Sequence, residues 1–256
     1  MQLNRREYLH RAVGGVTVGA FASTSSASVR GEPRFKAIAF DAFPIFDPRP
    51  IAALAEQLFP TKGPELSEAW RIRQFEYQWL RALSCRYSDF WQTTEDSLKF
   101  AAKALRLDLT PSHREKLMGA FLELKAWPDV APTLRALRGA GVRLAFLSNA
   151  TPKILRAGIE NAGLQDLFEH VLSTDAIRTF KPDPRAYQMA VDAFGLVRGE
   201  IAFAAFAGWD VAGAKWFGFP TFWVNRLGSL AEELGVVPDA AGRNLVDLSN
   251  FIGGSR

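Results

Sequence analysis

The chain has 256 residues, of which 48% are hydrophobic and 23% are charged, as is typical of a globular protein. Its formal net charge is +4, and N-terminal arginines carry part of it, so the remainder is too nearly neutral to indicate nucleic-acid binding. The single cysteine, Cys85, excludes an intramolecular disulfide bond and a cysteine-based zinc site, and we expect it to be a small buried residue on a helix. The length predicts one large domain, or a core with a smaller second unit.

Residues 1–22 show the features of a targeting signal in the usual order. Residues 4–9 contain paired arginines and resemble a twin-arginine signal, residues 12–21 are weakly apolar, and Ala20-Phe21-Ala22 is a small-x-small cleavage site. The apolar stretch is too short to cross a membrane, so we expect no membrane insertion. Twin-arginine export carries folded proteins, so the expected partner is the twin-arginine translocase and the expected location is the periplasm. The alternative is a disordered basic tail; in either case residues 23–34 form a polar linker.

The folded part begins with a predicted strand, residues 35–40, whose short apolar run, residues 37–40, ends abruptly in Asp41. Such a run is typical of a central strand in a parallel α/β sheet, because both faces of that strand are buried. A carboxylate at the C-terminal end of the strand lies where open α/β sheets bind ligands. The alternative for Asp41 is a residue that caps a turn.

After this strand, prolines at 44, 48 and 50 interrupt regular structure, and residues 51–124 show helical patterns only. Asp89 is a plausible N-cap, and Thr110-Pro111 is an N-cap followed by a first-turn proline. The predicted helices cover residues 51–59, 65–84, 89–105 and 110–124. We therefore expect residues 48–125 to form a helical cap subdomain inserted after the first strand.

From Trp127 the pattern alternates between helix and strand. The predicted helices are 130–138, 152–162, 184–194, with Asp183 as its cap, and 211–217. The predicted strands are 142–147, 170–173, 201–206 and 221–224. Alternating units of this kind predict a parallel sheet with right-handed crossovers. The fold class is therefore α/β, with a Rossmann-like parallel sheet core formed by residues 35–47 and 126–256.

Three later stretches carry polar residues of the types that a carboxylate nucleophile needs nearby. They are Leu147-Ser148-Asn149, Phe180-Lys181-Pro182-Asp183 and Trp209-Asp210. Together with Asp41, and in this order around a helical insertion, they resemble the haloacid dehalogenase superfamily. The more detailed resemblance is to its L-2-haloacid dehalogenase (type II) branch. It runs from about residue 35 to residue 237, and includes Trp70-Arg71, Phe75-Glu76-Tyr77 and Gly218-Phe219-Pro220-Thr221.

The resemblance implies covalent catalysis by Asp41, whose carboxylate attacks the halogen-bearing carbon and forms an ester that water then hydrolyses. Lys181 matches the cation that keeps this carboxylate ionised, since an opposite charge within a few ångströms lowers a carboxylate pKa. The alternative for Lys181 is an exposed lysine before a turn. Asp210 matches the acidic residue that orients the hydrolytic water or holds Lys181.

One position separates this chain from the phosphatases of the superfamily. They have a second aspartate two residues after the nucleophile, whereas this chain has Phe43, which can neither donate a proton nor bind a hard cation. The nearest other carboxylate, Asp47, lies between prolines and indicates a loop. We therefore expect no metal, no cofactor and no phosphoryl transfer.

The resemblance also implies the substrate-binding residues. Arg71 and Asn149 match residues that receive the departing halide, and a weakly hydrated guanidinium suits a large anion. The alternative for Arg71 is a surface residue that extends along an aromatic helix face. Ser148 matches the residue that hydrogen-bonds the substrate carboxylate, and Tyr187 matches a tyrosine that supports the lysine. The apolar wall around the halogen is assigned to three aromatic residues, which could equally be core residues: Phe75, Phe90 and Trp209.

Two motifs depart from the family pattern. The segment 41–47 is one residue shorter than usual and lacks a threonine that hydrogen-bonds the nucleophile. The segment 205–210 has Ala205 and Ala207 where the family has a serine and an asparagine. Each lost hydrogen bond could contribute roughly 1–3 kcal/mol. Either backbone donors and water replace these groups, or hydrolysis of the ester is impaired.

The expected function is hydrolytic dehalogenation of a short (S)-2-haloalkanoic acid to the (R)-2-hydroxy acid. The first alternative is a catalytically impaired, carboxylate-binding relative, and the second is a phosphatase of the same superfamily, which Phe43 disfavours. A homodimer is a further expectation, because the aromatic-rich cap helices could form its interface.

Overall fold

The structure is a computed structural model that describes residues 34–254. The expected signal segment, residues 1–22, and residues 23–33 of the expected linker lie outside the described residues. No helix within residues 34–254 is both long and apolar enough to cross a membrane.

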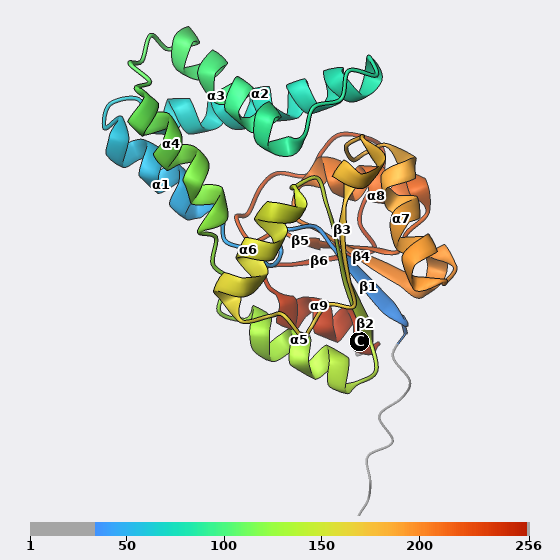
Figure 1. The fold of residues 1–256 in the computed structure, drawn as a ribbon. Coiled ribbons are helices and arrows are strands. Elements are labelled where there is room, and N and C mark those ends of the chain that lie inside the picture. Colours follow the sequence, from blue (N-terminus) through green and yellow to red (C-terminus); the bar gives the residue numbers. More distant parts are fainter. Residues whose placement is uncertain (1–33, 255–256) are drawn as a thin grey trace, which may run out of the picture. The chain divides into compact units, whose positions relative to one another are not determined.

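Within the described residues, six strands form one parallel sheet in the order β3-β2-β1-β4-β5-β6 (Figure 1). Their bounds are Ala37–Phe40 (β1), Arg143–Ser148 (β2), His170–Ser173 (β3), Ile201–Ala205 (β4), Thr221–Val224 (β5) and Ala240–Gly242 (β6). Every residue of β1 is buried, and Phe40 is in register with Phe146 of β2 and Ala204 of β4. The prediction of a buried central strand that ends just before Asp41 is therefore confirmed.

Helices cover both faces of the sheet, so alternate residues of β1 enter different cores. Ile38 and Phe40 pack with α5 (Val130–Gly139), α6 (Pro152–Ala162) and α9 (Leu245–Gly253). Ala37 and Ala39 pack with α7 (Pro184–Phe194) and α8 (Gly208–Phe217) on the other face. Figure 1 shows the two groups of helices on opposite sides of the strands. This two-sided burial explains why the strand is apolar throughout.

The segment between β1 and α5 is helical. It contains α1 (Arg49–Leu58), α2 (Gly63–Leu83), α3 (Phe90–Ala104), α4 (Pro111–Gly119) and a 3₁₀ turn (Ala120–Leu122). As predicted, Asp89 caps α3 by accepting a hydrogen bond from the Gln92 N–H, and Thr110 caps α4 in the same way. The segments by which the chain enters and leaves this cap pair through an antiparallel bridge between Phe46 and Ala126. The expected α/β fold with an inserted helical cap is confirmed.

Some elements differ from the sequence analysis. α8 begins at Gly208 rather than at residue 211, so Trp209 and Asp210 lie in its first turn. β6 and α9 were not predicted; β6 has only three residues, of low strand propensity, and follows a long loop. The expectation for Cys85 was wrong: it is exposed and lies just beyond α2 with a positive φ of 56°.

Candidate active site

A buried lysine joins two carboxylates at the C-terminal ends of the central strands. The Lys181 Nζ lies 2.9 Å from Asp41 Oδ1 and 2.6 Å from Asp210 Oδ2. The side chains of Lys181 and Asp210 are each 1% exposed, whereas that of Asp41 is 14% exposed. Asp41 is therefore the member of the group that substrate can reach, and Lys181 and Asp210 lie behind it.

Local structure brings Asp41, Lys181, Tyr187 and Asp210 together from three parts of the chain. Asp41 follows β1, Asp210 lies in the first turn of α8, and Tyr187 lies on α7. Lys181 precedes α7; its N–H donates to Asn149 Oδ1 at 2.8 Å, and its carbonyl accepts from Trp79 Nε1 of the cap at 3.3 Å. The backbone N–H and the carbonyl of Lys181 are thus both hydrogen-bonded, which fixes the backbone from which the ammonium group extends.

Burial and charge act in opposite directions on this group. Burial raises the pKa of Asp210 to about 6, and the attraction of Lys181 only partly offsets that effect. Burial alone would lower the pKa of Lys181, but the two neighbouring carboxylates outweigh it and raise the pKa above its ordinary value. Lys181 therefore stays protonated at neutral pH, and Asp210 titrates close to the physiological range.

Tyr187 is placed differently from the expectation that grouped it with the substrate-binding residues. It is fully buried on α7, does not line the cavity above Asp41, and donates its hydroxyl hydrogen to Asp210 Oδ1 at 2.7 Å. Burial, with the charge of Asp210, raises its pKa well above the ordinary value. Tyr187 is therefore linked to Lys181 through Asp210 and does not line the cavity.

A cavity of about 500 Å³ lies over Asp41, between the cap and the strand ends. It is large enough for a short carboxylic acid. Seven of the predicted site residues line it: Asp41, Arg71, Phe75, Phe90, Ser148, Asn149 and Trp209. The structure thus brings together residues that are up to 168 positions apart in the chain, as the sequence analysis expected of a single site.

Aromatic residues line parts of this cavity and pack against one another. The Phe75 ring lies 5.2 Å from that of Trp209, and Trp79 lies 5.6 Å from Trp209, both in edge-to-face contact. Phe90 packs edge-to-face on Phe121 at 5.8 Å. Arg71 is exposed and forms no ion pair with any described residue, so its charge is available to an anion in the cavity.

The cavity also has polar residues that the sequence analysis did not identify. Gln74 and Gln78 of α2, and Glu232 of the loop after β5, line it. Gln78 is fully buried and its Oε1 accepts a hydrogen bond of 2.9 Å from Asn149 Nδ2. Gln74 and Gln78 lie at i+3 and i+7 from Arg71, so all three residues share one face of α2. This spacing is the sequence pattern that could have identified the two glutamines.

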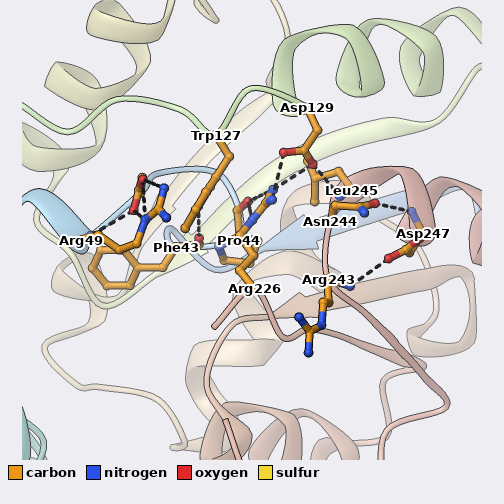
Figure 2. Close-up of polar contacts among 11 residues, drawn as sticks. Phe43, Pro44, Arg49, Trp127, Asp129, Arg226, Arg243, Asn244, Leu245 and Asp247 are labelled. Atoms are coloured by element: carbon orange, nitrogen blue, oxygen red, sulfur yellow. Dashed lines mark hydrogen bonds and ion pairs between the residues drawn. The ribbon is translucent and has the colours of Figure 1, made fainter. Parts of the chain in front are cut away.

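Side chains from other parts of the chain hydrogen-bond to the backbone carbonyls of the loop after Asp41 (Figure 2). Trp127 Nε1 donates to the Phe43 carbonyl at 3.1 Å. Arg226 donates to the Pro44 carbonyl at 2.9 and 2.7 Å and pairs with both carboxylate oxygens of Asp129. The Arg226 side chain is only 4% exposed. These contacts, which the sequence analysis did not identify, fix the loop that follows Asp41.

Few hydrogen-bond donors lie beside the Asp41 carboxylate. Within the described residues, the Asp41 side chain accepts a hydrogen bond from Lys181 and a long one, of 3.5 Å, from the Phe43 N–H. Phe43 and Phe206 face each other at 5.7 Å between ring centroids. Backbone therefore replaces the missing side chains only weakly.

A metal site was not expected. Among residues 34–254, no group of three or more histidine, cysteine, aspartate or glutamate side chains is arranged to hold a metal ion. Asp47, the nearest other carboxylate in sequence, pairs with Arg49 instead of turning towards Asp41. The absence of a metal requirement stays a prediction.

Comparisons with known proteins agree with this geometry. The family model for haloacid dehalogenase-like hydrolases matches residues 9–218. The (S)-2-haloacid dehalogenase of Pseudomonas sp. (strain YL) is 44% identical over 205 residues, which cover 80% of this chain and 88% of that protein.

Solved structures give the same result. The L-2-haloacid dehalogenase RSc1362 superposes with a TM-score of 0.83 at 44% identity, covering 85% of this chain and 98% of that one. The L-2-haloacid dehalogenase from Xanthobacter autotrophicus, with chloropropionic acid covalently bound, has a TM-score of 0.79 at 34% identity, covering 87% of this chain and all of that one. The chain is therefore a hydrolase that belongs to the haloacid dehalogenase-like family, in its L-2-haloacid dehalogenase branch.

Proposed function

We propose that this enzyme hydrolyses short (S)-2-haloalkanoic acids to (R)-2-hydroxyalkanoic acids. One oxygen of the Asp41 carboxylate attacks C2 from the face opposite the carbon–halogen bond, so the halide leaves as the ester bond forms and C2 is inverted. Water then adds to the Asp41 carbonyl carbon, and the ester C–O bond breaks to release the hydroxy acid. The hydroxyl oxygen of the product comes from Asp41, and the water oxygen stays in its carboxylate.

The observation that carries this proposal is the Asp41–Lys181–Asp210 group under a largely apolar cavity with Phe43 beside it. Lys181 Nζ holds Asp41 Oδ1 at 2.9 Å, so the carboxylate that attacks C2 is fixed in place beneath the cavity. The apolar wall excludes water from the first step and accommodates the halogen. Arg71, from the cap, supplies a positive charge for the anionic substrate or the departing halide.

The second step depends on Asp210 and on backbone groups. Ionised Asp210 holds the Lys181 ammonium beside Asp41 while the ester is hydrolysed, since its pKa of about 6 leaves it charged at neutral pH. The first turn of α8 leaves N–H groups without intrahelical acceptors beside Ala207 and Gly208, which line the cavity. Losing one oxyanion donor slows such a step by about 100–1000-fold. We therefore propose that ester hydrolysis limits turnover.

Two experiments test these steps. A single turnover of (S)-2-chloropropionate in ¹⁸O-labelled water should place the label in Asp41 and leave the first lactate unlabelled. Rapid mixing should give a burst of about one halide per site, followed by a slow phase, with the acyl ester on Asp41 visible by mass spectrometry. Label in the first product would contradict covalent catalysis, and linear halide release with unmodified enzyme would contradict rate-limiting hydrolysis.

The same assays separate the alternative functions. An impaired relative would release one halide per site and then stop, which the burst experiment detects directly. A phosphatase would release phosphate from a small phosphomonoester in the presence of magnesium and lose activity with a chelator. Phe43 favours the dehalogenase reaction, because it offers neither a proton nor a metal ligand.

We also propose that residues 1–22 direct twin-arginine export to the periplasm and that the enzyme forms a homodimer through the cap. Paired arginines before an apolar stretch support export. Exposed apolar side chains on the cap support the dimer: Ile72, Leu80, Leu83 and Phe100. Light scattering of the protein lacking residues 1–22, with and without Leu80→Asp, tests the second proposal; a monomeric unsubstituted protein would refute it.

A further inference from the structure

Two side-chain amides lie in contact beside the cavity, and their orientation can be deduced. The Lys181 N–H and the Thr174 hydroxyl both donate to Asn149 Oδ1, at 2.8 and 3.3 Å. A backbone N–H can only donate, so this oxygen assignment is fixed, and Asn149 must turn its Nδ2 towards Gln78. Gln78 then has to present its oxygen to Asn149, as the 2.9 Å contact shows. Its Nε2 consequently points away from Asn149 Nδ2.

The Nε2 of Gln78 is left unsatisfied. It is buried and has no hydrogen-bond partner within the described residues, although Gln78 is fully buried and lines the cavity. Buried amide donors without a partner are rare, because burial removes their hydrogen bond to water and no protein group compensates for that loss. Gln74, one turn earlier, differs: its Nε2 donates to Thr94 Oγ1. The unsatisfied donor is thus a feature of Gln78 and not of glutamines on this helix in general.

The reaction geometry indicates what binds there. Backside attack by Asp41 sends the departing anion to the side of C2 opposite the nucleophile. Asp41 belongs to the strand ends, and α2 of the cap supplies another wall of the same cavity, with Arg71 two turns before Gln78. Gln78 Nε2 is a neutral donor without a partner among the described residues, and Asn149 Nδ2 carries a second hydrogen that Gln78 does not use. Both residues line the cavity, so the two amides can serve a monatomic anion bound there.

We propose that Gln78 Nε2, together with Asn149 Nδ2, binds the departing halide and makes the enzyme selective for small halides. This inference rests on the proposed dehalogenase function for its role in turnover. Hydrogen bonds to halides weaken from chloride to iodide, because the charge is spread over a larger ion. The contribution of Gln78 should therefore be greatest for chloride.

The test compares three variants of the full-length enzyme. Gln78→Glu keeps the oxygen that Asn149 needs but removes the donor, Gln78→Met removes both, and Gln74→Met is the matched control on the same helix face. Chloride affinity of the resting enzyme is measured by ³⁵Cl NMR line broadening at pH 9, where a buried glutamate is also ionised. Inhibition of 2-chloropropionate and 2-bromopropionate turnover by chloride and bromide gives the second readout.

Both Gln78 variants should bind chloride at least about tenfold more weakly than the unsubstituted enzyme, with a smaller loss for bromide. Gln78→Glu should be no better than Gln78→Met, because its carboxylate offers no donor and repels anions. A greater loss for chloride than for bromide in Gln78→Met distinguishes a donor to the halide from a residue that only positions Asn149. Chloride affinity within twofold of normal in Gln78→Glu, an equal loss in Gln74→Met, or no chloride binding by the unsubstituted enzyme would each overturn the inference. Absence of halide release from every 2-haloacid, with chloride binding still lost in the variants, would refute the proposed function alone.

Discussion

Removing the Tyr187 hydroxyl should change the pH dependence of turnover. Tyr187→Phe deletes the donor that lies 2.7 Å from Asp210 Oδ1 and leaves a ring of nearly the same shape in a fully buried position. The ionised carboxylate loses a hydrogen bond that the protonated form needs much less. The pKa of Asp210 should therefore rise.

The size of the effect follows from the bond that is lost. A hydrogen bond to a charged group contributes about 1.5–3 kcal/mol, and one pKa unit corresponds to about 1.4 kcal/mol. The pKa of Asp210, about 6 in the unsubstituted enzyme, should rise by about 1–2 units. Because Asp41 and Asp210 share Lys181, the acid limb of the pH–rate profile reports the whole group, and it should move from near 6 to between about 7 and 8.

Stability should change in the same pH range. A carboxyl whose pKa is raised by folding holds a proton that the unfolded chain has lost, so its charging lowers the free energy of unfolding as the pH rises through that window. In Tyr187→Phe the window extends to higher pH. Between pH 5 and pH 8, the free energy of unfolding of Tyr187→Phe, measured by urea denaturation, should therefore decrease by roughly 1.5–3 kcal/mol more than that of the unsubstituted enzyme.

Tyr87→Phe is the control. The Tyr87 hydroxyl also donates to a carboxylate at 2.7 Å, that of Asp175, but neither residue lines the cavity or contacts Lys181. Its pH–rate profile should match that of the unsubstituted enzyme. An unmoved acid limb in Tyr187→Phe, or an equal shift in both variants, would refute the assignment of that limb to Asp210.

Three further predictions concern other parts of the chain. Asp41→Asn should abolish halide release while circular dichroism shows an unchanged fold, because an amide is nearly isosteric but a poor nucleophile; normal turnover would remove Asp41 from its role. Arg226→Met should lower the free energy of unfolding by about 3 kcal/mol and reduce kcat, since it frees the loop after Asp41. Arg49 is exposed and contacts the same tryptophan ring as Arg226, so Arg49→Met should lower the free energy of unfolding by less than about 1 kcal/mol. The double substitution Arg5→Lys and Arg6→Lys should block export without affecting activity, and periplasmic recovery of that variant would contradict the twin-arginine route.

Much of the fold could be predicted because its signals are local. The apolar run of β1, the N-caps Asp89 and Thr110, and the glycines that close α6 and α7 each specify an element boundary within a few residues. The start of α8 was misplaced because Gly208 has a low helix propensity, and the packing of that helix on the sheet overrides it. β6 exists through its pairing with β5, which no local pattern expresses.

The site divides in the same way. Asp41, Lys181 and Asp210 belong to recognisable motifs at strand and helix ends, so sequence reasoning could group them. The contacts of Arg226 with Pro44, 182 positions apart, and of Asn149 with Gln78, 71 positions apart, depend on the packing of the cap on the core. Gln78 on its own is one more polar residue on an amphipathic helix. Only its complete burial beside Asn149 distinguishes it.

The altered motifs act in opposite directions on the two chemical steps. A carboxylate with fewer hydrogen-bond donors is less stabilised as an anion, so Asp41, held by Lys181 and weakly by the Phe43 N–H, should be a more reactive nucleophile. The same loss removes donors for the oxyanion that forms when water attacks the ester. Ala205, Ala207 and the Phe43–Phe206 contact thus favour formation of the intermediate and disfavour its hydrolysis. Lys181 cannot compensate fully, because its ammonium is already shared with Asp210, so the balance between the steps depends on Asp210 and on the backbone of the first turn of α8.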